Sequence, residues 1–595
     1  MTPAFSHLSS FPRRDLLAIF LVALALNTLA AAFISRPGYM DAYYYFGGAL
    51  QLARGKGFTE PYLWNYLSIG RTASPSLQVF STWETGVRGF PGHLYWMPLT
   101  SIIAAPFIVI AGANRPATEL FRAAQIPSVL LASALPLLSY LVATFTTGLR
   151  RHALAAAALT VFSGFYTLYW ADTDSFALYG CIGASALFFI ALAFRASSPP
   201  PVTSAPVRLP KAVRVYFFCA GLCAGLAHLT RADGVFLLFL ALAFVLYVVF
   251  KCGIRNTQSV QSLLTHYFLP LLLGYLIPAA PWFLRNFITV GSPLVPGTSR
   301  ALWLTEYNDL FNYPADTLTL GRYLAQGWGA MLAGKWWALQ TNLTRLVAEQ
   351  GIIVAAPFIL VGLWKLRREA LYAPALIYFG MVFALMTFVF PFPGARGGLF
   401  HSGAALLPFL YPAAIVGLDA SVVAGTRFQR WMITSLSARY PALGLLFPPW
   451  QPAKSTPIFT LLLVLFAAVL TALIFRSGVV GADWRNPKSA QVDEVYVEVG
   501  QWLAQAGDAQ SAIAVNDPPG FYFFTAHPSI MIPNGNTDTL VRAMRDFGAQ
   551  WIVLDRNYPA GLESLYTTPT VAAPLILRAT FTDDQQKPVY LFELP

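Results

Sequence analysis

The residue best suited to do chemistry is Asp41, an acid set among aromatic side chains directly after the first long apolar stretch. It lies in the run PGYMDAYYY at residues 37–45, and a long loop follows it. A carboxylate at a membrane interface, beneath a loop that can fold over it, can act as a general base on a membrane-associated substrate. A solvated interfacial acid would have the same surroundings, so Asp41 is a candidate base.

Other ionisable residues fall in short turns between apolar stretches. Acids and cations that converge on one face of a membrane suit an anionic, lipid-linked molecule. Each residue alone could equally anchor a helix end or pair with an opposite charge. The candidates are Asp172 and Asp174 in the run 170–176, Arg231 and Asp233 in 229–234, Arg285 in PWFLRN at 281–286, Arg396 and His401 in 394–401, and His93 in 91–98.

These positions need a scaffold, and the composition predicts an α-helical membrane protein. Hydrophobic residues make up 56% of the 595 residues, and charged residues only 11%, whereas soluble domains carry about 25%. So few charges cannot cover the surface of a soluble protein. Several apolar runs are long enough to cross a hydrocarbon core of about 30 Å. The net charge of +12 is therefore interpreted as a topology signal and not as nucleic-acid binding.

The apolar pattern predicts eleven spans. They cover residues 16–34, 121–147, 153–170, 175–195, 215–230, 235–251, 263–282, 350–366, 371–392, 400–418 and 457–475. A further apolar piece at 97–113 is interrupted by two prolines, and we expect a re-entrant or interfacial helix there. The first span could also be a cleaved signal peptide, but the parity of the later loops favours its retention.

With this arrangement the basic loops all lie on the cytoplasmic side, as the positive-inside rule expects. The N-terminus is then inside and the C-terminus outside. If 97–113 spanned instead, the charge bias would invert. The inside loops hold three acids (Asp15, Glu369 and Asp419) against the cations Arg13, Arg14, Arg150, Arg151, Arg195, Arg208, Lys211, Arg214, Lys251, Arg255, Lys365, Arg367, Arg368, Arg427, Arg430, Arg439 and Lys454.

Three large pieces are then expected outside: residues 36–118, residues 283–349 and the tail 478–595, which follows a transmembrane domain at 1–477. The tail alternates helical and strand-like patterns, which predicts a compact α/β domain. Helices are expected at 489–506 and 537–547, and strands at 512–515, 530–533 and 551–554. The Pro-rich stretch 199–210 is interpreted as a cytoplasmic linker.

The four cysteines encode neither a disulfide framework nor a zinc site. All lie within or at the ends of apolar segments, and the tail has none. Cys219 and Cys223 share a helical face, but no His or carboxylate accompanies them to complete a tetrahedral set of ligands. They are expected to be small apolar residues of a membrane helix.

The order of features along the chain is a first span, an aromatic loop with an acid, a Thr-Asp turn at 173–174, a Leu-Thr-Arg turn at 229–231, PWFLRN at 281–286 followed by GSPL at 291–294, and an outer α/β tail. This order resembles the GT-C superfamily of polyprenyl-phosphate-sugar-dependent glycosyltransferases. Bacterial relatives of the protein O-mannosyltransferases and of the lipid A aminoarabinose transferase are the most similar. The resemblance covers residues 10–480, while the tail is similar only in kind.

The resemblance implies a GT-C-like fold and roles for individual residues. Asp41 corresponds to the first-loop acid, the base, and Asp174 to the acid of the Thr-Asp turn, as an acceptor-side or second acid. Arg231 and Arg285 correspond to basic positions near the lipid phosphate. His93 lies near the His-Pro-type element of the family, although the run HLYWMP at 93–98 matches it only loosely.

Two further residues, His401 and Arg396, are expected to line the same site. Ala42 stands where the family often has a second acid, which puts a metal-chelating pair in doubt. No metal ligand or cofactor is firmly implied, and the need for a divalent metal is left open.

The implied reaction is an inverting transfer of a sugar from a polyprenyl phosphate to a hydroxyl group of a protein, lipid or surface glycan. Asp41 would take the proton of the acceptor hydroxyl, and Arg285, Arg231 or His93 would neutralise the departing phosphate. The leaving phosphate needs no general acid. The place of the reaction would be the outer face of a bacterial cytoplasmic membrane, and the expected partners are the lipid-linked sugar, its acceptor and membrane lipids, with no nucleic acid.

Three other interpretations remain. A polysaccharide polymerase or ligase would use a diphosphate-linked glycan, and the lipid product released would distinguish it. A secondary transporter would also carry intramembrane charges, but inverted repeats, which are common in transporters, are not evident in the sequence. A non-catalytic assembly subunit is the third interpretation.

Overall fold

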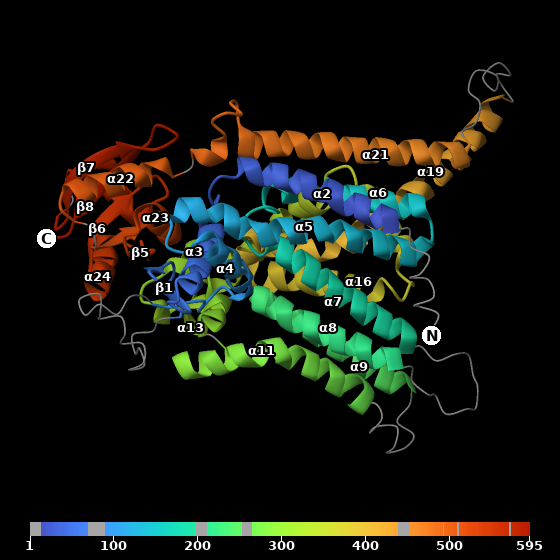
Figure 1. Cartoon of the computed structure of the whole chain (residues 1–595), viewed down its shortest axis with the longest axis horizontal. Coiled ribbons are helices and arrows are strands. Elements are labelled where there is room, and N and C mark those ends of the chain that lie inside the picture. Colours follow the sequence, from blue (N-terminus) through green and yellow to red (C-terminus); the bar gives the residue numbers. More distant parts are fainter. Residues whose placement is uncertain are drawn as a thin grey trace.

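The computed structural model describes most of the chain, in the ranges 13–68, 90–197, 211–252, 264–294, 296–437, 451–491, 493–508, 511–570 and 573–595. The segment 69–89, which belongs to the first loop expected outside, and the Pro-rich stretch expected as a linker lie outside the described residues. Long helices run side by side, and a domain containing a β-sheet covers one end of the bundle (Figure 1).

Seven helices among the described residues are long and apolar enough to cross a membrane, so this is a multi-pass membrane protein. They match seven of the expected spans: α2 (Arg13–Phe33), α5 (Ala117–Thr147), α7 (Phe176–Ser197), α8 (Lys211–Thr230), α11 (Leu269–Val290), α19 (Leu407–Ser437) with the turns before it, and α21 (Pro452–Phe475). The other four expected spans correspond to shorter helices, α6 (Arg150–Val161), α9 (Val235–Cys252), α15 (Ala356–Leu366) and α16 (Ala373–Ala384).

The stretch expected as one span at 153–170 is split. Helix α6 ends at Val161, and a short 3-10 turn covers Gly164–Leu168. Gly164 has a φ of 63°, a conformation that glycine adopts without the steric penalty of a side chain. The indole N–H of Trp170 donates to the Ser163 hydroxyl at 2.7 Å, which secures the turn.

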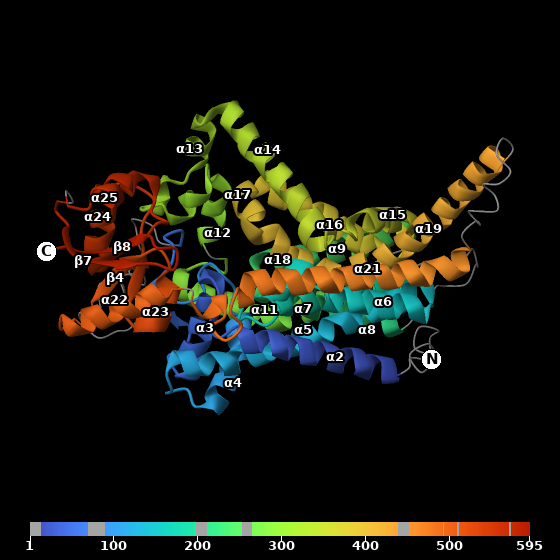
Figure 2. The ribbon, with the colours of Figure 1, turned by 90° about the horizontal axis from the view of Figure 1, so that it is seen from above.

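The apolar piece expected at 97–113 is the 13-residue helix α4 (Leu99–Ala111). At 1.5 Å per residue it is about 20 Å long, too short for a hydrocarbon core of about 30 Å. It packs against α3 (Met40–Ala53) and α5, at the end of the bundle that carries the sheet domain (Figure 2). This placement fits a re-entrant or interfacial helix.

Glycine allows the closest approach between two of the membrane helices. On α8, a Cβ at Gly221 would lie 2.0 Å from the carbonyl oxygen of Leu271 on α11, and Gly274 of α11 meets the α8 backbone in the same way. Small residues at such contacts let helix backbones touch, which stabilises association where lipid supplies no hydrophobic driving force.

Helix α2 begins at one end of the bundle and finishes beside the sheet domain at the other. At its start, Asp15 accepts two hydrogen bonds of 2.7 Å from Arg150, the first residue of α6. At its end, the carbonyl of Phe33 accepts a hydrogen bond from Ser489 at 2.6 Å, and Arg36 pairs with Glu494 at 3.4 Å. The beginning of the first span and the C-terminal domain therefore lie at opposite ends of the bundle (Figure 1).

The C-terminal domain is built on a six-stranded mixed sheet with the order β2-β5-β4-β6-β8-β7. The predicted elements are present as helices α22 (Glu494–Gln505) and α24 (Thr537–Phe547) and strands β4 (Ala512–Val515), β5 (Ser529–Met531) and β6 (Ala549–Leu554). Helix α23 (Pro518–Thr525) and the antiparallel strands β7 (Ile576–Thr582) and β8 (Pro588–Glu593) were not anticipated. The strands β5, β4 and β6 are parallel neighbours, as in an α/β unit.

One strand of this sheet comes from the long segment 36–118 after the first span. Strand β2 (Tyr62–Leu63) pairs in parallel with β5, more than 450 residues further along the chain. The hydroxyl of Tyr66 donates to the carbonyl of Met531, and the backbone N–H of Asn534 donates to the carbonyl of Phe311 at 3.0 Å. The C-terminal domain therefore holds the segments 36–118 and 283–349 in place, and the sheet extends beyond residues 478–595.

Candidate functional site

A cavity of about 330 Å³ lies between the segment 36–118 and the ends of several membrane helices. We call it the central cavity. Its lining combines two acids, two arginines and a histidine with many aromatic side chains. The lining residues are Asp41, Tyr45, Trp64, Tyr95, Trp96, Met97, Arg231, Ala232, Asp233, Val235, Phe236, Thr298, Ala301, Tyr307, Leu310, Met386, Phe390, Pro393, Arg396, Gly397, Gly398 and His401.

Asp41 reaches the cavity from the first turn of α3. Asp174 lies behind it, buried in the turn that precedes α7. An oxygen of each carboxylate and a ring nitrogen of His401 all lie within 4.8 Å of one another. The structure thus brings together three residues that the sequence singled out from segments more than 100 residues apart.

The turn at 172–174 also fixes the start of α3. Asp172 accepts a hydrogen bond of 3.2 Å from the backbone N–H of Gly38, and the hydroxyl of Thr173 donates to the carbonyl of Ala42 at 2.9 Å. The hydroxyl of Tyr39 donates to Asp174 at 2.5 Å. These contacts bracket Asp41 on both sides, so the Thr-Asp turn positions the candidate base.

His401 is held by the same turn from another direction. Its ring stacks on Phe176 with the centroids 3.7 Å apart and an angle of 18° between the rings. One ring nitrogen lies 3.2 Å from the hydroxyl of Ser175, and the other lies 3.9 Å from the carboxylate of Asp174. The imidazole therefore faces the two acids and is one wall of the cavity.

The two carboxyls are unusually basic. Burial, and then the charge of nearby Asp174, raise the pKa of Asp41 to about 8, although Arg231 acts in the opposite direction. Burial also raises the pKa of Asp174, while the hydrogen bond from Tyr39 lowers it. A carboxyl with a pKa near neutrality is suited to general-base catalysis, because it both ionises and holds a proton at working pH.

Arg231 and Arg396 are the positive charges of the central cavity. Arg231 pairs with Asp233 at 3.0 Å, and Asp233 accepts a further hydrogen bond from Ser402. Arg396 is exposed and lies over the ring of Tyr307, with the guanidinium carbon 4.7 Å from the ring centroid. Among the described residues no ion pair involves Arg396, so its charge can be offered to an anionic ligand.

An aromatic wall faces these charges. We use this name for Trp64, Tyr95 and Trp96, whose rings line the cavity. The two indoles stack with their centroids 3.8 Å apart and nearly parallel, and Tyr95 meets Trp64 edge to face at 5.0 Å. Trp64 directly follows β2, so pairing with the C-terminal sheet sets the position of this wall.

The structure does not bring Arg285 to the cavity lining. Its guanidinium donates to the carbonyls of Gly92 at 2.8 Å and Phe58 at 3.3 Å, and lies over the ring of Trp282 at 4.7 Å. These contacts join α11 to residues that flank the two short strands β1 (Thr59–Glu60) and β3 (Phe90–Pro91). Arg285 therefore holds the loop that carries the aromatic wall.

His93 lies in the same layer behind the cavity. Its backbone N–H donates to Glu60 at 2.5 Å, and Glu60 accepts another hydrogen bond from the hydroxyl of Tyr44. Burial, followed by the charge of Arg285, lowers the pKa of His93 to about 3, so its ring is neutral at physiological pH. A neutral imidazole cannot offset the charge of a phosphate.

Glu60 positions the loop behind the cavity, and the sequence did not point it out. It is buried, and burial raises its pKa to about 7, while the hydrogen bond from Tyr44 lowers it. It holds the segment before Tyr95 and Trp96 through its contact with the His93 backbone. The sequence signal that could have identified Glu60 was an acid within a Tyr- and Trp-rich loop. Nothing in the pattern distinguished Glu60 from a solvent-exposed acid.

Asp41, Asp174 and His401 are the described residues whose ligand atoms could hold a metal ion. Two carboxylates and an imidazole form a donor set that several divalent cations accept. However, the carboxylate of Asp174 already accepts hydrogen bonds from Tyr39 and from the backbone N–H of Ser175. Arg231 supplies positive charge at the same place.

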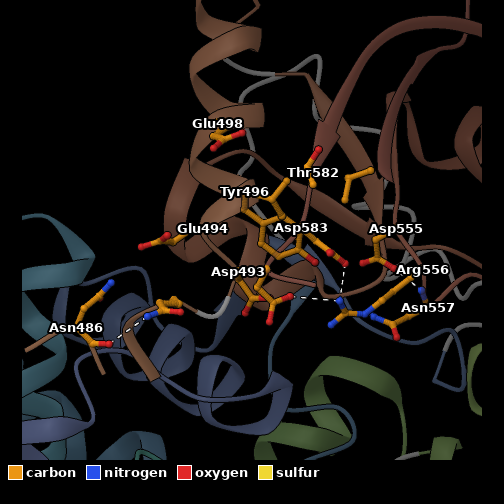
Figure 3. Close-up of a pocket in the computed structure, with 14 residues that line it drawn as sticks. Asn486, Asp493, Glu494, Tyr496, Glu498, Asp555, Arg556, Asn557, Thr582 and Asp583 are labelled. Carbon is orange, nitrogen blue, oxygen red and sulfur yellow. Dashed lines mark hydrogen bonds and ion pairs between the residues drawn. The ribbon is translucent and has the colours of Figure 1, made fainter. Parts of the chain in front are cut away.

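A second cavity, of about 380 Å³, lies in the C-terminal domain (Figure 3). Acids dominate its lining, including Asp493, Asp555 and Asp583, and Arg556 pairs with Asp583 at 2.5 Å. The hydroxyl of Tyr43 on α3 donates to Asp493 at 3.4 Å. This cavity therefore adjoins α3 on the side away from the central cavity, and it holds none of the residues that the sequence singled out.

No family model and no curated protein matches this sequence. Solved structures do resemble it over most of its length. ArnT from Cupriavidus metallidurans bound to undecaprenyl phosphate is 13% identical, with a TM-score of 0.51 and 98% of each chain covered. The oligosaccharyltransferase AglB from Archaeoglobus fulgidus, in complex with an inhibitory peptide and a dolichol-phosphate, is 12% identical, with a TM-score of 0.50 over 91% of this chain and 69% of AglB.

The apo form of the Archaeoglobus enzyme gives the same TM-score at 13% identity. At such low identity the likeness concerns the fold. The chain has a GT-C-like fold, as the resemblance in its sequence implied.

Proposed function

We propose that this protein is an inverting glycosyltransferase that moves a sugar from a polyprenyl-phosphate donor to a hydroxyl acceptor. The observation that carries the proposal is the central cavity, where Asp41 faces Arg231 and Arg396 at the end of the membrane helices. A base and a phosphate clamp in one cavity are the two elements that this reaction needs. The GT-C-like fold shared with ArnT supports the same conclusion.

Asp41 is the base in this mechanism. As the acceptor oxygen attacks the anomeric carbon, its proton passes to the carboxylate of Asp41, and the bond from the anomeric carbon to the phosphate oxygen breaks. Attack from the opposite face inverts the anomeric centre. General-base assistance of this kind is typically worth 10²- to 10⁴-fold in rate. Asp174 and His401 lie next to Asp41, and burial together with the charge of Asp174 keeps the proton affinity of Asp41 high.

Arg231 and Arg396 neutralise the leaving phosphate. The donor's bonding electrons move to the phosphate oxygen, and the guanidinium groups stabilise the developing charge through charge-assisted hydrogen bonds. Arg285 and His93, for which the resemblance implied this role, instead hold the loop behind the aromatic wall. The donor's isoprenoid tail stays in lipid beside the membrane helices.

The remaining features of the proposal concern place and partners. The membrane is the cytoplasmic membrane of a bacterium, with the start of α2 inside and the C-terminal domain outside. The opposite ends of the bundle that these two elements occupy support this orientation. The acceptor is a protein, a lipid or a surface glycan.

The test is mass spectrometry of envelope glycans and lipids from a deletion strain. The missing sugar identifies donor and acceptor, and wild-type protein should restore it. Asp41→Asn should not restore it, whereas Asp538→Asn, the same change on the exposed face of α24, should. In a purified reaction the lipid released should be polyprenyl monophosphate. Release of a diphosphate would instead support a polymerase or ligase.

A further inference from the structure

Helix α14 (Gly327–Arg345) exposes large apolar side chains, as the membrane-spanning helices do. It is absent from the helices apolar enough to cross a membrane among the described residues. It leaves the body of the bundle at an angle, with α13 (Leu320–Ala325) at its far end (Figure 2). A helix that neither spans nor buries its apolar face needs another environment for that face.

The outward face forms a regular stripe. Trp328, Leu332 and Trp336 follow one another at intervals of four residues, which places them on one side of a helix. Their exposed fractions are 77%, 62% and 58%. The buried residues of α14, Met331, Ala338 and Asn342, lie on the adjoining side, about 100° around the helix axis from the stripe. The helix thus exposes large apolar side chains that a helix packed on a soluble protein would bury.

This stripe continues into surfaces that face lipid. Beyond α14, exposed apolar residues follow at Val347, Ile353 and then Leu360 and Trp364 on the membrane helix α15. Large exposed apolar side chains on such a helix contact acyl chains. The run 327–345 contains no acid and has Lys335 beside Trp336, which suits a surface of lipid phosphates.

We propose that α14 lies in the bilayer leaflet next to the C-terminal domain, with Trp328, Leu332 and Trp336 among the acyl chains and Lys335 at the level of the phosphates. The proposal does not depend on the transferase activity. Tryptophan is the side chain most characteristic of this depth, because its ring is apolar and its N–H is polar.

The contacts of α14 with the rest of the protein connect its depth in the bilayer with the central cavity. The ring of Trp337 stacks on Phe392 at 6.0 Å, and the amide of Asn342 donates to the carbonyl of Met386 at 3.2 Å. Met386 lines the cavity, and Phe392 is followed by the segment 393–398 that carries Arg396. The leaflet therefore supports the cavity wall that presents Arg396.

The test measures the depth of position 332 with a fluorescent label. Leu332→Cys is made in a variant whose four native cysteines are replaced by Ala, labelled with nitrobenzoxadiazole and reconstituted in phosphatidylcholine vesicles. Lipids spin-labelled at carbon 5 or carbon 12 of the acyl chain serve as quenchers. Leu360→Cys on α15 is the matched control for lipid contact, and Gln585→Cys, in the exposed turn between β7 and β8, is the control for water.

The label at 332 should be quenched at least half as strongly as the label at 360, and more by the carbon-5 lipid than by the carbon-12 lipid. Quenching no greater than at 585 would overturn the proposal. It would mean that the stripe contacts a protein partner or water instead of lipid. Because removal of the cysteines can disturb folding, a lipid-soluble carbene reagent provides a second measurement on the unmodified chain. It should label the peptide containing 328–336, and an unlabelled peptide would also refute the proposal.

Discussion

Replacing Asp174 with Asn should lower the pKa of Asp41, because it removes the closest negative charge. The relevant oxygens lie within 4.8 Å of each other. Two unit charges at that distance repel by about 3.5 kcal/mol at an effective dielectric constant of about 20, and by about 0.9 kcal/mol in water. At about 1.36 kcal/mol per pKa unit, the pKa of Asp41 should fall from about 8 by roughly 0.6 to 2.5 units.

Infrared spectroscopy of the carboxyl C=O band follows this titration without a substrate. The band that disappears in Asp41→Asn belongs to Asp41, and its midpoint is compared between wild type and Asp174→Asn. Since the two acids are coupled, wild type should titrate in two steps and Asp174→Asn in one. Because the base acts as a carboxylate, the pH at which kcat/KM rises should move down by the same amount.

Asp172→Asn is the matched control for this experiment. It makes the same chemical change two residues away, on a carboxyl whose partners are the backbone N–H groups of Gly38 and Thr173. It should leave the titration of Asp41 nearly unchanged. A midpoint that stays at its wild-type value, or rises, in Asp174→Asn would refute the electrostatic coupling and leave burial as the cause of the raised pKa of Asp41.

Arg396→Ala should weaken binding of undecaprenyl phosphate by about 10- to 100-fold at an unchanged Tm. If titration calorimetry gives the same affinity for the variant and for wild type, Arg396 does not belong to the phosphate site. Arg285→Ala should instead lower the free energy of unfolding by about 3 kcal/mol with little change in lipid affinity. A loss of lipid affinity without a loss of stability would assign Arg285 to the phosphate site. Since the pKa of Asp41 is raised on folding, its ionisation lowers the stability of the wild-type protein as pH rises from 4 to 8. Asp41→Asn should therefore have a higher Tm than wild type at pH 8 and an equal Tm at pH 4. A lower Tm of the variant at pH 8 would contradict the burial of the Asp41 carboxylate. EDTA should change the turnover rate by less than about twofold, because Arg231 supplies the positive charge. A loss of activity that added Mn²⁺ reverses would make Asp41 a metal ligand.

Much of the fold could be predicted because a membrane helix is determined by the residues of its own segment. A run of apolar residues must span or be buried whatever its neighbours are, and the predicted strands at 512–515 and 551–554 follow from the same kind of local pattern. The split at 161–164 was missed because a glycine within an apolar run does not by itself end a helix. Strand β2 was missed because its two residues gain their partner only through pairing with β5.

The site was predicted in part for a similar reason. The sequence alone indicated that Asp41, Asp174, Arg231 and His401 lie at or near the borders of apolar runs. Only the tertiary structure decided which cations face the cavity. Arg285 and Arg396 occupy equivalent positions in the sequence pattern, but Arg285 turns its guanidinium to two backbone carbonyls, whereas Arg396 is exposed and faces the cavity. Side-chain direction depends on contacts between segments far apart in the chain, and a linear pattern of residue types does not contain those contacts.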